Sequence, residues 1–223
     1  MKFGINCGHT VAGPGSGAVG IINESVETRE VGNALISLLR ANGHEVINCT
    51  IDRANSQNAY LKEAVNLANN KTLDYFISIH FNAGGGQGVE VYTYKGRQFT
   101  DALEVCANIS ALGFKNRGVK DGSGLYVVHK TKAKSMLIEC CFVDTEDANK
   151  YKQLGAQKLA EAIYNAIVDT NSVAPSPQPT PNPGQNKYAV GQKVRFSTCY
   201  KSSTAPNSEA ILATNMARNY GII

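Results

Sequence analysis

Four polar side chains lie where chemistry could be organised, at the ends of predicted strands or the start of a predicted helix. His9 follows a short apolar strand, and His80 follows the almost continuous apolar run DYFISI. Glu24 opens a helix after a glycine-rich loop, and Glu139 lies within the apolar sequence MLIECCFV. Two histidines and one carboxylate form a zinc site that leaves a fourth position open, as catalytic zinc requires. The sequence therefore predicts that His9, Glu24 and His80 bind Zn2+ as a catalytic metal.

Glu139 is the candidate for acid and base catalysis. A carboxylate inside an apolar strand is costly to bury without a partner, so this residue needs either a partner or a chemical role. Zinc held nearby would lower the pKa of its bound water toward about 7 and polarise a substrate carbonyl. A second carboxylate is then needed to take up a proton and return it to a leaving amine. Burial raises the pKa of Glu139, which suits this role.

Other reaction types have weaker support in the sequence. There is no G-x-S-x-G motif for a serine nucleophile. The glycines from 13 to 20 do not directly follow a predicted strand, as a dinucleotide-binding loop would, and no Walker lysine follows them. Cys7 and Cys140 are near the candidate site, but no helix start or basic neighbour lowers their thiol pKa. We interpret all six cysteines as small buried hydrophobic residues rather than as disulfides. The remaining histidines, His44 and His129, lie in polar settings and receive no role.

Strands and helices alternate along the first 170 residues. This alternation predicts an α/β fold with a roughly six-stranded, mostly parallel or mixed sheet flanked by helices. Ligands in such sheets bind beyond the carboxyl ends of the strands, where the four candidate residues are expected. The expected strands are 3–7, 45–51, 74–79, 88–94, 125–128 and 136–143, and the expected helices are 26–41, 60–68, 99–109 and 147–168.

The chain divides into three predicted regions at a proline-rich segment. Residues 1–170 form the main domain, and residues 171–186 form an extended, semi-rigid linker with five prolines and no charge. Residues 187–223 form a small C-terminal region in which a strand pattern is followed by a short helical pattern. The first region carries 17 basic and 17 acidic residues, so the tail carries the whole net charge of +4. A basic tail favours an anionic partner, but it lacks the aromatic and arginine pattern typical of nucleic-acid binding.

The motifs around the four candidate residues resemble those of the zinc amidase family of cell-wall hydrolases known as amidase 3. The matching motifs, in order, are GH at 8–9, a glycine-rich loop leading to Glu24, SIHFNA at 78–83, and LIE at 137–139 followed by an ED pair. The resemblance implies a zinc amidase catalytic domain at 1–170, with His9, Glu24 and His80 as zinc ligands and Glu139 as acid and base. It also implies an N-acetylmuramoyl-L-alanine amidase, which hydrolyses the amide between N-acetylmuramic acid and L-alanine in peptidoglycan.

The chain departs from the family pattern at three places. Cys7 stands where an acidic residue is common, and Cys140-Cys141 replace a pair such as Leu-Gly. The segment 50–53 only loosely matches the family's T-R-x-x-D motif. None of these departures removes a predicted zinc ligand.

The order of the regions resembles that of a bacteriophage endolysin. The tail resembles the start of an SH3-like module that binds cell walls, although 37 residues are too few for a lone barrel. The module is therefore incomplete, completed by another chain, or simply a weakly ordered basic tail. We find no signal peptide and no membrane span, which predicts synthesis in a host cytoplasm and action on the wall after membrane permeabilisation. The expected partners are peptidoglycan and, through the basic tail, anionic wall polymers.

Two alternatives accompany this interpretation. A bacterial autolysin has the same chemistry but more often carries its own signal peptide. A non-catalytic cell-wall-binding protein would keep the amidase fold without turnover. Such a protein would be expected to have lost at least one of His9, Glu24, His80 and Glu139, and all four are present.

Overall fold

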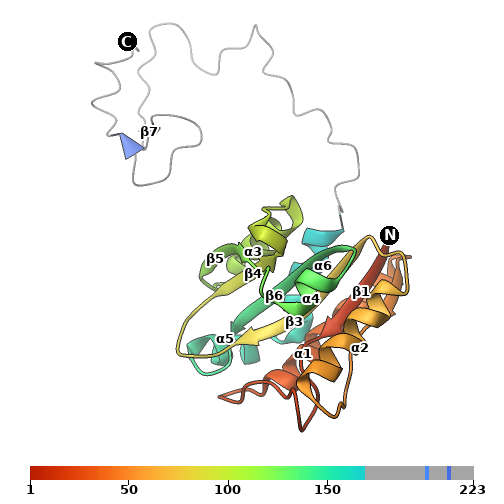
Figure 1. Ribbon diagram of the computed structural model, residues 1–223. Coiled ribbons are helices and arrows are strands. Elements are labelled where there is room, and N and C mark those ends of the chain that lie inside the picture. The colour runs from red at the N-terminus through yellow and green to blue at the C-terminus, as the bar shows by residue number, and fades with distance from the viewer. Residues whose placement is uncertain (169–198, 201–209, 212–223) are drawn as a thin grey trace, which may run out of the picture. The chain divides into compact units, whose positions relative to one another are not determined.

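The computed structural model describes residues 1–168, 199–200 and 210–211 (Figure 1). The chain divides into two units, Met1–Thr170 and Asn171–Ile223. In the second unit the described residues are two short antiparallel strands, β7 (Cys199–Tyr200) and β8 (Ala210–Ile211). The predicted linker at 171–186 and most of the predicted module at 187–223 lie outside the described residues, so both stay predictions.

The first unit alternates strands and helices, as expected. Its strands are β1 (Lys2–Cys7), β2 (Glu45–Asn48), β3 (Tyr75–Asn82), β4 (Val89–Thr93), β5 (Asn116–Asp121) and β6 (Lys134–Phe142). Its helices are α1 (Glu24–Ala41), α2 (Gln57–Asn69), α3 (Thr100–Ala111), α4 (Tyr126–Lys130), α5 (Glu146–Leu154) and α6 (Ala156–Ile167), with a short 3-10 turn, η1, at Tyr94–Gly96. None of the helices that the structure describes combines the length and apolar character that a bilayer crossing needs.

The six strands form one mixed sheet in the order β2-β1-β3-β6-β4-β5. Strands β2, β1, β3 and β6 run parallel, β4 runs antiparallel to β6, and β5 runs parallel to β4. Figure 1 shows β5 and α3 toward one end of the sheet and β1 and α2 toward the other. The prediction of a six-stranded mixed sheet flanked by helices is confirmed.

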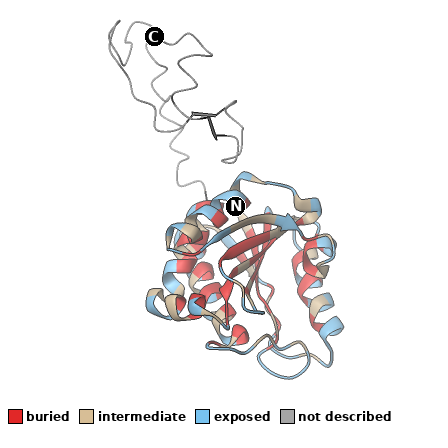
Figure 2. Ribbon diagram, turned by 90° about the vertical axis from the view of Figure 1, so that its left-hand side faces the viewer, coloured by how far each residue is buried: buried red, intermediate tan, exposed pale blue. Residues whose placement is uncertain are grey.

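The two faces of the sheet are covered differently. Helices α1, α3 and α6 bury one face with a large apolar core that includes Phe3, Ile77 and Ile138. On the other face, α2 and α4 pack around Phe76 and Leu137. Figure 2 shows the buried residues concentrated in the strands and on the helix surfaces that pack against them.

The second face changes character along its strands. Side chains two residues apart in a strand share a face, so Ser78 and His80 follow Phe76 on this side, and Glu139 follows Leu137. The apolar part under α2 and α4 therefore gives way to a polar part at the carboxyl ends of β3 and β6. This polar part carries two of the residues singled out by the sequence.

One predicted strand is wrong, and one observed strand was not predicted. Residues 125–128 were expected to form a strand but form the N-cap and first turn of α4, in which the Val128 and His129 amides both donate to the Leu125 carbonyl. Val127 and Val128 pack into the apolar cluster under that face, so a helical turn buries both side chains. The sixth strand is instead β5, a polar sheet edge that the hydrophobic pattern did not indicate.

Two predicted boundaries also differ. The expected helix at 147–168 is broken by Gly155, whose φ of 80° lies in the left-handed region that favours glycine, so α5 ends there and α6 begins. The strand expected at 45–51 ends at Asn48, where the Asn48 side chain accepts a hydrogen bond from the Thr50 amide and turns the chain.

Candidate metal centre

Three side chains converge at the carboxyl ends of β1 and β3. His9 follows β1, Glu24 begins α1, and His80 lies near the end of β3. The Glu24 Oε1 atom lies 3.0 Å from His9 Nε2 and 3.1 Å from His80 Nδ1. The possible ligand atoms of all three residues lie within 4.8 Å of one another, close enough to hold one metal ion.

The hydrogen bonds of His9 determine which of its nitrogens faces Glu24 as an acceptor. The Nδ1 atom lies 3.0 Å from the Gly15 carbonyl, which can only accept, so Nδ1 carries a proton. In the neutral ring this leaves a lone pair on Nε2. The His9 backbone has a φ of 66°, and its amide donates to the Tyr60 hydroxyl at 2.8 Å, which fixes the turn after β1.

A longer chain of hydrogen bonds orients His80. The Asn6 amide nitrogen donates to the Cys49 carbonyl at 3.0 Å, so its Oδ1 accepts from the Ser78 hydroxyl at 2.8 Å. With its own proton used, Ser78 Oγ accepts from His80 Nε2 at 3.1 Å. The neutral His80 ring then has its lone pair on Nδ1, which faces Glu24.

This donor set fits a cation such as zinc. Two imidazole lone pairs and a carboxylate oxygen point at one another, an arrangement that is repulsive unless protons or a positive ion lie between them. Neutral imidazoles oriented by outer hydrogen bonds are typical zinc ligands. Burial raises the pKa of Glu24, but when protons lie between the three side chains, hydrogen bonds from His80 and His9 lower it well below its usual range, so the carboxylate is ionised.

The loop and helix around Glu24 hold this carboxylate in place. Asn23 caps α1 by accepting from the Ser25 amide at 3.0 Å, which sets Glu24 in the first turn. Glu24 Oε2 accepts from the Ala18 amide at 2.9 Å, and Oε1 accepts from the Phe81 amide at 3.1 Å. The glycine-rich loop thus folds against the ligand rather than standing apart from it.

Two glycines make room for the ligands. A Cβ added to Gly8 would lie 2.3 Å from the His80 ring, and one added to Gly17 would lie 2.7 Å from Glu24 Oε2. Either substitution would displace a ligand or the loop that holds it, so the backbone can approach the ligands this closely only at glycine.

Glu139 lies next to this centre, on the neighbouring strand. It is the register partner of His80 across β3 and β6, and of Glu90 across β6 and β4. Its Oε2 atom is buried and has no hydrogen-bond partner among the described residues. Burial, with a further contribution from the Glu24 and Glu90 charges, raises the pKa of Glu139 to about 8.

Sequence reasoning missed Glu90, which is 3% exposed. Its Oε1 accepts from the side-chain amide of Asn82 at 2.8 Å and from the Tyr92 hydroxyl at 3.0 Å. Its Oε2 accepts from Arg117 Nε at 2.7 Å. The signal that could have found it is the one that singled out Glu139, an acid within an apolar strand sequence. Asn6 and Ser78 were also missed as residues that orient a ligand.

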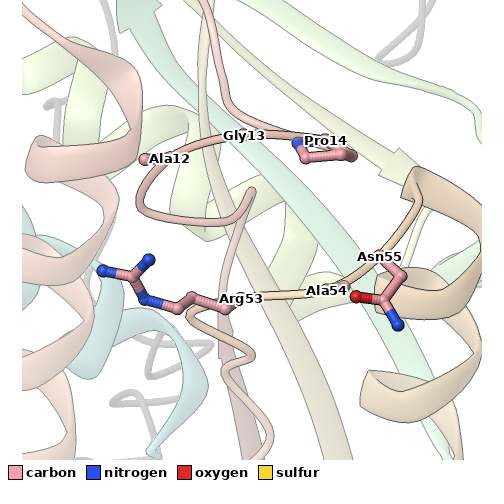
Figure 3. A pocket seen from close by; sticks show the side chains of 6 residues that line it. All are labelled: Ala12, Gly13, Pro14, Arg53, Ala54 and Asn55. Atoms are coloured by element: carbon pink, nitrogen blue, oxygen red, sulfur yellow. The ribbon is translucent and has the colours of Figure 1, made fainter.

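A surface hollow lies between two loops, one of which follows His9 in the sequence (Figure 3). Its volume is about 380 Å³, and it is bounded by Ala12, Gly13 and Pro14 on one loop and by Arg53, Ala54 and Asn55 on another. The two loops are joined by a hydrogen bond from the Val11 amide to the Asp52 carbonyl, 2.9 Å long. Arg29 connects them to α1, because it donates to the His9 carbonyl at 3.0 Å and contacts Asp52.

The remaining candidates lie away from the convergence. His44 packs edge-on against Phe3, and His129 stacks on Tyr94. Five of the six cysteines lie within the described domain, and all five are buried and free of disulfides, as predicted: Cys7, Cys49, Cys106, Cys140 and Cys141. Burial raises the pKa of the Cys49 thiol to about 12 and that of Cys106 to about 11, and it raises those of the other three as well. Thiols of this kind are poor nucleophiles.

Comparison with known proteins places this geometry in a family. Residues 4–169 match the Amidase_3 family model, described as N-acetylmuramoyl-L-alanine amidase. A sporulation-specific N-acetylmuramoyl-L-alanine amidase of Bacillus subtilis is 32% identical over 220 residues, which covers 94% of this chain and 81% of that protein. An uncharacterized Clostridium perfringens protein is 35% identical over 176 residues, and the match spans only about half of its length (51%).

Solved structures agree with the sequence comparison. The catalytic domain of the CD27L endolysin, which targets Clostridia difficile, superposes with a TM-score of 0.70 at 28% identity. The match covers 76% of this chain and 97% of that domain. Sequence motifs, sheet order and the converging side chains all lie within the matched region. The chain belongs to the Amidase_3 family of N-acetylmuramoyl-L-alanine amidases.

Proposed function

We propose that this protein is a zinc-dependent peptidoglycan hydrolase that cleaves the amide bond between N-acetylmuramic acid and the L-alanine of the stem peptide. The observation that carries the proposal is the orientation of His9 and His80. Outer hydrogen bonds leave an imidazole lone pair of each aimed at the ionised Glu24. Such a cluster lies next to Glu139, which has a buried oxygen without a hydrogen-bond partner among the described residues. This combination suits metal-assisted hydrolysis.

In this proposal His9, Glu24 and His80 hold the metal. Bound Zn2+ would supply a Lewis acid for the substrate carbonyl and would lower the pKa of a coordinated water. The Gly15 carbonyl keeps the His9 ring in the required tautomer, and Ser78 does the same for His80. The Glu24 carboxylate stays fixed because two backbone amides donate to it.

Glu139 is the proposed general base and acid. Its pKa of about 8 lies near neutral pH, where a carboxyl group both accepts and returns a proton readily. As base it takes the proton from the attacking water, and as acid it delivers that proton to the nitrogen of the leaving L-alanine. Its buried Oε2 atom has no competing hydrogen bond from any residue that the structure describes.

We further propose an endolysin-type role, in which the protein made in a host cytoplasm reaches the wall after the membrane is permeabilised. The likeness to an endolysin catalytic domain supports this role. The match to a sporulation-specific amidase, at 32% identity over 94% of the chain, favours an alternative role. In this role the protein remodels the wall of the bacterium that makes it. The linker and the net positive tail at 187–223 are proposed to hold the catalytic domain near anionic wall polymers. The endolysin-type role predicts that cells expressing the protein lyse only when a membrane pore is co-expressed. The alternative role predicts lysis without such a pore.

The reaction is tested with purified cell walls and Glu139→Gln, compared at equal zinc content with the wild-type protein. The wild type should release stem peptides with a free L-alanine amine, identified by mass spectrometry. The variant should bind zinc equally but lose activity by about 10²- to 10⁴-fold, the usual contribution of acid–base catalysis. Intact walls in both reactions, with protein bound to them, would favour a non-catalytic wall-binding protein. Equal cleavage by the variant would keep the enzyme but reject Glu139 as its acid and base.

A further inference from the structure

A row of polar side chains extends from the metal centre across the sheet. His80, Glu139 and Glu90 are successive register partners on β3, β6 and β4, so their side chains share one face. Arg117 on the edge strand β5 completes the row through its 2.7 Å bond to Glu90. Neighbouring strands lie about 4.8 Å apart, so Glu90 is about 10 Å from the strand of His80.

A bulge in β5 places Arg117 in this row. Val89 pairs with Asn116 and Val91 pairs with Val119, so β5 carries one extra residue opposite Glu90. The next residue, Gly118, has a φ of 75°, which accommodates the bulge. Bulges of this kind change the direction of a side chain, and here the bulge lets Arg117 reach Glu90.

Contacts with Glu90 and Phe142 hold the Arg117 side chain in place and leave its terminal nitrogens available as hydrogen-bond donors. Its guanidinium carbon lies 5.2 Å from the centre of the Phe142 ring, and its Nε donates to Glu90. Neither terminal nitrogen donates a hydrogen bond to any residue that the structure describes, and the side chain is 33% exposed. A guanidinium held by Nε and an aromatic face presents its two terminal nitrogens as a fork, which matches a carboxylate.

The chemistry of the proposed reaction determines in which direction the stem peptide runs along this row. In the scissile amide the carbonyl belongs to the muramic acid side and the nitrogen to the peptide. The metal centre, which would polarise the carbonyl, lies at β1 and β3, whereas Glu139, the proton donor to the nitrogen, lies on β6. The peptide therefore leaves the metal toward β4 and β5, the side on which Arg117 stands.

Chain dimensions agree with this direction. Consecutive Cα atoms are about 3.8 Å apart, so the main-chain carboxyl carbon of the second stem residue lies about 6 to 7 Å beyond the scissile nitrogen. With that nitrogen near Glu139, the second residue falls over Glu90 and Arg117. In peptidoglycan this residue is an acidic amino acid linked through its side chain, which leaves its α-carboxyl group either free or amidated.

We infer that Arg117, held by Glu90, binds the free α-carboxylate of the second stem-peptide residue and so makes the enzyme prefer walls in which that group is not amidated. The inference rests on the proposed function and adds a specificity residue to it. Arg117 acts through substrate binding, so its loss should raise KM for the free-acid substrate and leave kcat nearly unchanged.

The test uses the full-length, zinc-loaded protein and two muramoyl peptides that differ only in a free or an amidated α-carboxyl group on the second residue. The wild type should prefer the free acid in kcat/KM by about 10- to 100-fold, the range for one charge-assisted hydrogen-bonded pair. Arg117→Gln should reduce this ratio to about 1, chiefly through KM for the free-acid peptide. Lys120→Gln, which removes an exposed charge from the same strand, should keep the wild-type ratio.

A second variant guards against misfolding. Arg117→Lys retains a positive charge beside Glu90 but lacks the paired terminal nitrogens of arginine. It should also lose most of the preference for the free-acid peptide, and its melting temperature should stay near that of the wild type. A wild type that cleaves both peptides equally well would overturn the inference alone. A preference that persists in Arg117→Gln would also overturn it. If the zinc-loaded wild type cleaves neither peptide and releases no stem peptide from walls, the proposed function itself fails, and the inference with it.

Discussion

Glu90 and Glu139 are opposite partners on antiparallel strands, yet their carboxylates have contrasting surroundings. Three hydrogen bonds, one of them from Arg117, satisfy Glu90. Glu139 has a buried oxygen with no partner among the described residues. Burial, with a further contribution from the Glu24 and Glu90 charges, raises the pKa of Glu139.

The raised pKa of Glu139 predicts a particular pH dependence of stability in the metal-free protein. Between its ordinary value of 4.5 and about 8, Glu139 keeps its proton when folded and loses it when unfolded. The folded state then binds more protons, so this residue lowers the free energy of unfolding as pH rises through that window. Glu139→Gln removes the effect and should become progressively more stable relative to the wild type from pH 4.5 to 8. Urea unfolding with a chelator present measures the difference, and a difference that is constant with pH would contradict the assignment.

The hydrogen-bond chain behind His80 predicts an effect on zinc affinity. Ser78→Ala removes the acceptor that keeps the proton on Nε2, and Asn6→Leu removes the group that orients Ser78. Each should weaken zinc binding by about 10- to 100-fold, as losses of outer hydrogen bonds to metal ligands do. Competition with a chromophoric chelator gives the affinity.

A serine elsewhere provides the control for this series. Ser37→Ala removes a hydroxyl that bonds only within α1, so it should leave zinc affinity at the wild-type value. Equal affinity in Ser78→Ala and Ser37→Ala would show that the tautomer of His80 does not depend on Ser78.

Gly8 provides a steric test of the same ligand. A Cβ at this position would lie 2.3 Å from the His80 ring, which Glu24 and Ser78 hold from the other sides. Gly8→Ala should therefore destabilise the fold by about 1 to 3 kcal/mol, as overpacking does, and should displace His80. Gly124→Ala is the matched control because its Cβ meets nothing within 4 Å. Thermal unfolding and zinc titration of the pair distinguish crowding at His80 from a general cost of replacing glycine.

Zinc binding should also stabilise the folded protein measurably. A ligand that binds only the native state adds about 2.7 kcal/mol to the free energy of unfolding at a hundred times its Kd. Added zinc should therefore raise the melting temperature of the chelator-treated wild type. His9→Ala and His80→Ala should show little of this increase. An equal increase in the wild type and both variants would indicate that zinc binds elsewhere.

The sequence was sufficient to predict the sheet and the convergence of four residues, because buried strands leave a clear apolar signal. DYFISI and MLIECCFV are such runs. His80 directly follows the first and Glu139 lies within the second, so both had to lie near the carboxyl ends of neighbouring parallel strands. β5 escaped prediction since only one residue of NRGVKD, Val119, is apolar. A strand at the edge of a sheet needs little burial, so its sequence carries little pattern.

Other features depended on contacts that no local pattern encodes. The sequence around Val127 and Val128 suits a buried strand as well as a buried helical turn, and only packing under the sheet selects the turn. The roles of Asn6 and Ser78 follow from which atoms are donors along a chain of three side chains. Such an order of donors and acceptors is visible only when the strands are aligned.

The two edges of the sheet have a consequence for association between molecules. Long, flat, apolar edge strands pair with strands of other chains and seed aggregates. Here one edge, β2, has only four residues, and the other, β5, carries Arg117, Lys120 and Asp121 around a glycine bulge. Neither edge offers a regular template to a neighbouring copy. The catalytic unit is therefore suited to crowding on a surface at high local concentration without strand-to-strand aggregation.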